Sequence, residues 1–169
     1  MTHRILSLFV CVAILSTLTA QFASAQIVPW RTVGTGELDT ATGDFEGTAQ
    51  GIHLGRCTFS GESELFTTDD PMILEWWAID TYVSANGRDK VIICGSGIIE
   101  LMPMGGDVFE AVQTGTWDVI GGEGRFSNVG PADEPIAMVL FVEPFTFADE
   151  TWFWSGFEKI GEFDLGRNK

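Results

Sequence analysis

The feature that most constrains the fold is a series of strand-like segments separated by turn residues. Their residues alternate with a period of two or are apolar throughout, and no sustained helical periodicity occurs. The segments are Thr32 to Asp39, Phe45 to Leu54, Gly55 to Ser60, Met72 to Val83, Lys90 to Leu101, Val108 to Ile120, Ile136 to Val142 and Thr151 to Phe163. Regularly spaced strands without helices predict an all-β fold, an eight-stranded, mostly antiparallel barrel, with a β-sandwich as the alternative.

A glycine-rich stretch follows the sixth segment and predicts a tight reversal of the chain, because glycine adopts positive φ cheaply. The predicted structural turn comprises Gly121, Gly122, Gly124, Arg125 and Phe126. A phosphate-binding loop would need a helix directly after the glycines, and Gly130-Pro131 comes too soon for one. A second turn, Asn86-Gly87, is the strongest hairpin signal in the chain.

Three stretches resemble a known superfamily. Gly115-Thr116-Trp117, leading into the glycine-rich stretch, is similar to a turn of the allene oxide cyclase and dirigent-like barrels. The resemblance is closest to uncharacterised secreted bacterial members, which share patterns like Gly51 to Arg56 and Ser84 to Gly87. It implies a barrel, a lumen that handles lipid or phenolic intermediates, and a trimer like that of the plant members.

The first residues have the character of a secretory signal peptide. Arg4 precedes an apolar run, and Ala23-Ser24-Ala25 is a small-residue cleavage site. We therefore predict a signal peptide over residues 1–25 and a single domain over residues 26–169. The protein is expected to be secreted or periplasmic, with no membrane insertion after cleavage.

The charge excludes several partners. The formal net charge is −15, with no basic cluster, so nucleic acid is not an expected partner and anionic lipid is disfavoured. Asp69-Asp70 and Asp133-Glu134 could bind cations, but calcium-loop spacing is missing, and an acidic solubilising surface is the simpler interpretation. We predict neither a metal site nor a cofactor.

Cys57 and Cys94 are the two cysteines of the predicted mature chain. An even count in an oxidising compartment predicts a disulfide between them. The alternative is a pair of small buried thiols.

The candidate catalytic residues are His53, Glu75 and Glu100. His53 is the single histidine of the mature chain, which is too few for a triad or a histidine-based metal site. Carboxylates also occur within apolar strands, where burial is costly unless they are paired; these are Glu75, Asp80, Glu100 and Asp118. Arg56, Arg88 and Arg125 are the expected partners, and a carboxylate–arginine pair that fixes the turn is the structural alternative to acid–base catalysis.

Two segments are apolar on both faces. Trp76 and Trp77 alternate in one, and Trp152 and Trp154 alternate with Phe153 and Phe157 in the other. The candidate ligand-binding residues are Trp76, Trp77, Trp152 and Trp154, with core packing or a subunit interface as alternatives. Since a lone barrel needs one apolar face, the second apolar face predicts a homo-oligomer, with a trimer favoured.

Three functions remain open. The first is an exported barrel that binds a small apolar or aromatic ligand without catalysis. The second is a cyclase or isomerase acting on a reactive lipid or phenolic intermediate, as the resemblance implies. The third is a structural envelope or matrix protein, which a tightly filled barrel would favour.

Overall fold

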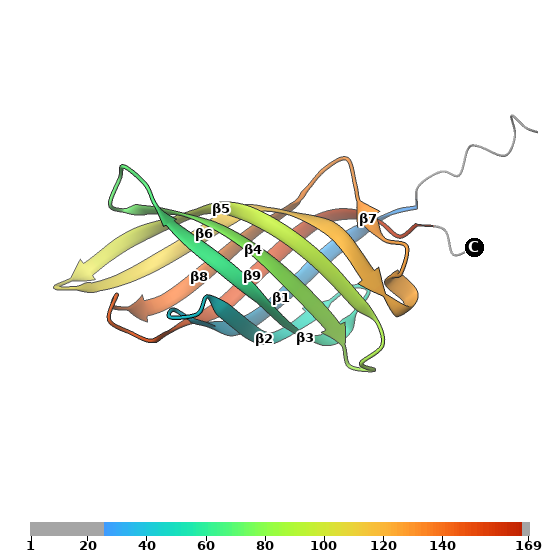
Figure 1. Cartoon of the computed structure of the whole chain (residues 1–169), viewed down its shortest axis with the longest axis horizontal. Helices are drawn as coiled ribbons and strands as arrows, with labels where there is room; N and C mark the ends of the chain where they lie inside the picture. Colours follow the sequence, from blue (N-terminus) through green and yellow to red (C-terminus); the bar gives the residue numbers. More distant parts are fainter. Residues whose placement is uncertain (1–25, 167–169) are drawn as a thin grey trace, which may run out of the picture.

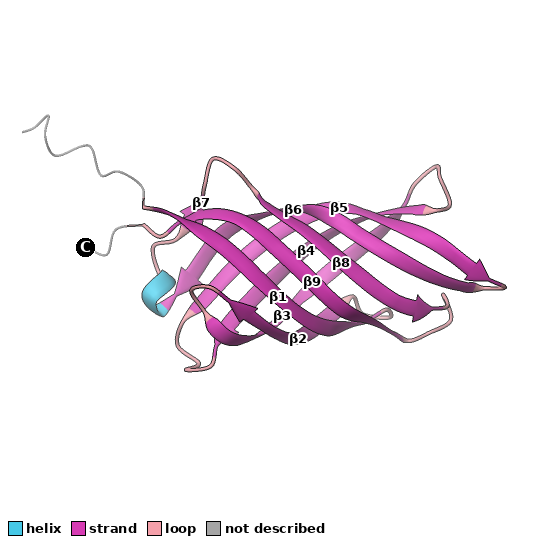
Figure 2. Cartoon of the chain, turned by 180° about the vertical axis from the view of Figure 1, so that it is seen from behind, coloured by secondary structure: helices cyan, strands magenta, loops and turns pink. Residues whose placement is uncertain are grey.

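The computed structural model describes residues 26–166, and the predicted signal peptide lies outside them. Antiparallel strands wind into an elongated barrel (Figures 1 and 2). The elements are β1 (Ile27–Asp39), β2 (Asp44–Gly51), β3 (Gly55–Thr67), β4 (Ile73–Ser84), β5 (Lys90–Gly105), β6 (Val108–Glu123), the 3₁₀ helix η1 (Gly124–Phe126), β7 (Gly130–Pro131), β8 (Ile136–Phe145) and β9 (Thr151–Asp164). None of the helices in this range is long and apolar enough to cross a membrane.

The sheet closes because its first and last strands pair. Ile27 lies opposite Asp164 and Asp39 opposite Thr151, so β1 and β9 run antiparallel along their full length. The two-residue strand β7 adds only a short bridge beside β9. The predicted eight-stranded antiparallel barrel is confirmed, and the sandwich alternative is wrong, since no edge separates two sheets.

Several strands are longer than the sequence pattern indicates. β1 begins at Ile27 rather than Thr32, and β3 continues to Thr67 rather than ending at Ser60. The added part of β3 is half-buried or exposed and reads Gly-Glu-Ser-Glu-Leu-Phe-Thr, so it lacks the apolar alternation that marks a half-buried strand. Backbone pairing to β4 nevertheless continues through it, from Gly61 to Thr67.

The two ends of the barrel differ. At one end lie η1, the β2–β3 and β4–β5 turns, and the ends of β1 and β9 (Figure 1). Aromatic side chains fill this end, and the Trp30 ring packs edge-on against Tyr82 and Phe163 at centroid distances of 5.6 and 5.4 Å. Phe126 of η1 also contacts Phe163. We call this the closed end, and the opposite end the mouth.

The glycine-rich stretch departs from the predicted tight reversal. β6 continues to Glu123, so Gly121 and Gly122 are strand residues, and the chain then passes through η1 and β7 before β8. Gly124 alone of the three has positive φ, at 65°. A side chain at Gly124 would collide with the Arg88 carbonyl oxygen and the Asp89 carboxylate, so this position needs glycine for both reasons.

A bulge in β9 changes which residues face inward. Gly34 lies opposite Phe157 and Gly36 opposite Trp154, so β9 holds one extra residue between them. Trp152 and Trp154 are buried before the bulge, and Phe157 and Lys159 are buried after it. The prediction that Phe157 lies on the face opposite Trp152 and Trp154 is therefore wrong.

Candidate functional site

The mouth half of the barrel contains an apolar cavity of about 50 Å³. Its aromatic wall comprises Phe45, Phe59, Trp76, Trp117, Trp152, Trp154 and Phe157. Leu65 lines the same cavity and is 38% exposed, so the cavity communicates with solvent at the mouth. By volume the cavity corresponds to roughly three to five water molecules, which favours a slender or small occupant.

An ion pair lies at the inner limit of this cavity. Lys159 of β9 donates to Asp80 of β4, with 2.8 Å between Nζ and Oδ2. The two side chains are 4% and 1% exposed, and both line the cavity. They come together because Asp80 has the inward parity of Trp76 and Ala78 on β4, while the β9 bulge turns Lys159 inward.

Aromatic rings surround the Lys159 ammonium. Nζ lies 3.6 Å from the centre of the Trp117 ring and 5.2 Å from that of Tyr82. A cation above a ring face is attracted by the ring quadrupole, most strongly for tryptophan. The rings thus replace part of the hydration that burial removes from the ammonium.

Burial acts on the protonation of both partners. It raises the pKa of the Asp80 carboxyl and lowers the pKa of the Lys159 ammonium, because the charged forms lose their hydration. Their mutual attraction and hydrogen bond oppose both shifts. The pair therefore places one carboxyl group and one amine at the inner end of an apolar chamber.

Several buried polar atoms here have no hydrogen-bond partner among the described residues. Asp80 Oδ1 and the indole nitrogens of Trp152 and Trp154 belong to residues that line the cavity, whereas the Tyr82 and Thr32 hydroxyls lie outside this lining. Burial raises the pKa of the Tyr82 hydroxyl well above its usual value, and the charge of Asp80 adds to this, so the hydroxyl stays protonated. Buried polar groups are usually paired, so this concentration makes the cavity the candidate site.

The predicted tryptophans divide between the two faces. Trp76, Trp152 and Trp154 are buried and line the cavity, whereas Trp77 faces outward and is 42% exposed. Trp77 is therefore not part of this site, because the side chains of a strand alternate between faces.

The three candidate catalytic residues do not meet. Glu75 and Glu100 are exposed on the outer face, as is Asp118. His53 lies in the β2–β3 turn at the closed end, where its Nε2 is 2.9 Å from the Pro29 carbonyl oxygen and its ring contacts Phe163. None of them lines the cavity.

The predicted disulfide does not form, and both cysteines are free. Cys57 faces inward on β3, while Cys94 has the outward parity of β5. A disulfide cannot join thiols on opposite faces of one sheet wall without moving the backbone. Burial, with a smaller contribution from Asp80, raises the pKa of the Cys57 thiol to about 11.

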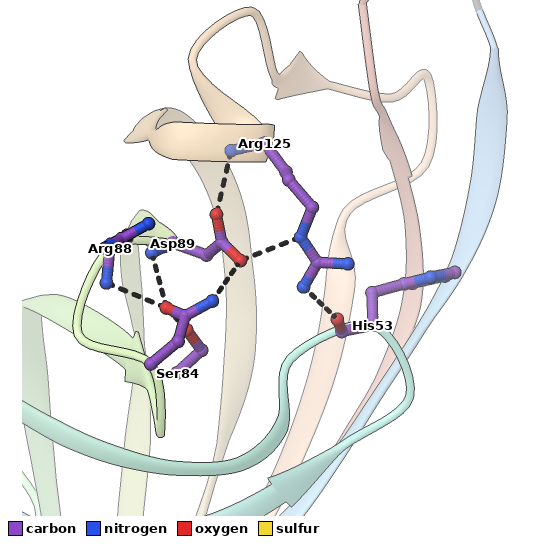
Figure 3. Close-up of polar contacts among 6 residues, drawn as sticks. His53, Ser84, Arg88, Asp89 and Arg125 are labelled. Atoms are coloured by element: carbon purple, nitrogen blue, oxygen red, sulfur yellow. Dashed lines mark hydrogen bonds and ion pairs between the residues drawn. The ribbon is translucent and has the colours of Figure 1, made fainter.

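A carboxylate–arginine pair does fix the closed end, but the carboxylate is Asp89 (Figure 3). Asp89 accepts from the backbone N and from Nε of Arg125, at 2.9 and 2.7 Å, and from the Asn86 amide at 2.8 Å. Arg125 Nη2 reaches the His53 carbonyl oxygen at 3.3 Å. The network joins η1 to the β4–β5 and β2–β3 turns, and it holds the pKa of Asp89 down to about 2, chiefly through the Arg125 backbone bond.

Lys159 is the residue that the sequence interpretation missed. Lys159 follows Phe157 by two residues and therefore lies on the same face of the strand, which strict alternation from Trp152 and Trp154 places outside the barrel. The sequence indicates that Asp80 is a carboxylate that is costly to bury, but it suggests an arginine as the partner. The one signal for Lys159 was a cation within a strongly apolar strand, together with Gly156, which can mark a bulge.

No group of three or more potential metal ligands occurs among residues 26–166. The chain matches no protein-family model, no curated protein and no solved structure.

Proposed function

We propose that this protein is an exported barrel that binds a small apolar or aromatic ligand in its lumen. The observation that carries the proposal is the cavity itself, with its aromatic wall, its opening at Leu65 and the Asp80–Lys159 pair at its inner limit. Ligand sites are typically apolar concavities with a few placed polar groups, and an eight-stranded barrel encloses room for one small ligand.

Tryptophan fluorescence tests the proposal directly, because Trp76, Trp117, Trp152 and Trp154 line the cavity. Titration of the mature protein with alcohols, phenols, fatty acids and sugars should give a saturable change for at least one apolar class. Trp154→Phe should weaken binding or reduce the signal. Trp77→Phe is the matched control, since it changes the same residue type on the outer face. A flat response to every class would overturn the proposal.

A second candidate is a cyclase or isomerase acting on a reactive lipid or phenolic intermediate. The buried pair favours it, because such chemistry needs a proton donor or acceptor deep in an apolar chamber. Asp80→Asn should then lower the rate of that isomerisation by more than it lowers the affinity for the ligand. A rate that falls only as far as the affinity falls would remove the acid–base role.

A further inference from the structure

The inner end of the cavity selects the chemistry of the ligand, an inference that rests on the binding function proposed above. We propose that the lumen binds an apolar molecule bearing one uncharged hydroxyl group, an alcohol or a phenol, with that hydroxyl beside the Asp80–Lys159 ion pair and within reach of both side chains.

Asp80 supplies the acceptor. Its Oδ2 is engaged by Lys159 at 2.8 Å, whereas Oδ1 is buried and makes no hydrogen bond of normal geometry to a described residue, although the Tyr82 hydroxyl lies near enough to lower the pKa of the Asp80 carboxyl. A buried carboxylate oxygen without a donor is costly, and a hydrogen bond to a charged group is stronger than one between neutral groups. A ligand O–H that donates to Oδ1 would satisfy this oxygen.

Lys159 supplies the donor. An ammonium has three N–H groups, and Nζ uses one for Asp80 while its positive charge faces the Trp117 ring. No other hydrogen bond from Nζ is present within residues 26–166. One ligand oxygen can therefore accept from Nζ while its own proton goes to Asp80, and a hydroxyl does both with a single atom.

Charge balance excludes ionised head groups. Asp80 and Lys159 together carry no net charge, and both are almost fully buried. A carboxylate would add a second anion beside the free oxygen of Asp80, and an amine would add a second cation beside Lys159. Either would leave a net charge in an apolar chamber, which is far more costly than burying a hydroxyl.

The wall adds a preference for the body of the ligand. Trp152 and Trp154 line the cavity, and their indole nitrogens are buried donors without partners. Indole nitrogen donates only, so these groups favour a carbonyl or ether oxygen on the ligand body and offer nothing to an additional donor. The surrounding rings favour an aromatic or unsaturated body.

Three ligands of nearly equal size test the head-group preference: benzyl alcohol, toluene and benzoate. We expect the intact mature protein at neutral pH to bind benzyl alcohol about tenfold or more tightly than either of the others, as one charge-assisted hydrogen bond would provide. The readouts are tryptophan fluorescence and calorimetry. The matched variant is the double substitution Asp80→Leu with Lys159→Met, which removes the polar pair and keeps a filled apolar wall. Toluene should bind this variant at least as tightly as benzyl alcohol, and circular dichroism should verify its fold.

The outcomes separate the two proposals. Equal binding of toluene and benzyl alcohol by the wild-type protein would overturn the hydroxyl preference while supporting a lumenal site. Tightest binding of benzoate would overturn it as well, because the free oxygen of Asp80 would then not control selection. Failure of all three ligands, together with a flat response to the wider ligand panel, would overturn the binding function itself.

Discussion

At the scale of single residues, the Asp80–Lys159 pair shows that the role of a charged side chain depends on which face of the barrel wall it occupies. Asp118 and Asp80 both interrupt apolar strands, yet Asp118 is exposed on the outer face and Asp80 is buried in the lumen. Only Asp80 therefore requires a partner of opposite charge. The pair places two charges where apolar side chains of similar size would fit, so it is a better sign of function than of stability.

We expect single substitutions of this pair to be more harmful than the double one. Asp80→Leu or Lys159→Met alone should lower the free energy of unfolding by about 3–5 kcal/mol, because each leaves an unpaired buried charge. The double variant should be close to the wild-type protein or above it. Urea denaturation of all four proteins measures this coupling, and additive losses in the double variant would contradict it.

The stability that Asp89 provides should depend on pH in a defined direction. Its folded-state pKa is lowered from 3.8 to about 2, so its contribution is present above about pH 4 and is lost as the pH falls towards 2. Asp89→Asn should lower the Tm at pH 7 by several degrees, and the difference from wild type should shrink across that acidic window. Asp118→Asn removes the same charge from the exposed outer face and serves as control. A difference in Tm that stays constant down to the acid limit would argue against the Asp89 network.

At the scale of elements, sequence patterns predict a strand well until its alternation is interrupted. In β4 the inward set of Trp76 and Ala78 and the outward Trp77 follow directly from a period of two. In β9 the same rule fails after one extra residue, which is why Phe157 was misplaced and Lys159 overlooked. The bulge depends on pairing with β1 and β8, information that β9 does not contain alone. The candidate site was therefore half visible in the sequence, through Trp76, Trp152 and Trp154.

The turns allow a matched test of why glycine is needed in η1. Gly87 and Gly124 have similar φ values of 69° and 65°, but a side chain would be unobstructed at Gly87, whereas at Gly124 it would come 2.6 Å from the Arg88 carbonyl oxygen. Gly87→Ala should cost about 1–2 kcal/mol for the left-handed backbone alone. Gly124→Ala should cost clearly more, because η1 must also move away from Asp89. Thermal denaturation compares them, and equal losses would show that the close approach is unimportant.

At the scale of the whole molecule, the outer surface carries both acidic and apolar groups. Ile98, Val112, Val139 and Phe141 occupy the outer face of β5, β6 and β8, and Phe141 is 53% exposed. Val112 pairs directly with Phe141, and Ile98 and Val139 lie on either side of Thr114, with which both are paired. An apolar group of this kind is a candidate interface, while the net charge of −15 opposes wider association.

We propose that this face forms a homo-oligomer, with a trimer expected from the resemblance to the plant barrels. Phe141→Lys should shift the mature protein towards monomer, whereas Ile52→Lys, at an exposed turn of the closed end, should not. Light scattering at tens of micromolar measures the mass. A wild-type protein that is monomeric under these conditions would contradict the proposal.

The pairing of β1 with β9 also constrains the order in which the strands of the barrel can pair during folding. Each strand from β2 to β6 pairs with the strand before it in the chain, but the pairing of Ile27 with Asp164 needs nearly the whole chain. Until β9 pairs with β1, the sheet therefore has two unpaired edges. Lys159 belongs to the last strand of the barrel, so Asp80 has no ion-pair partner until that strand has paired. The lumen and the ion pair are thus completed in the same late step.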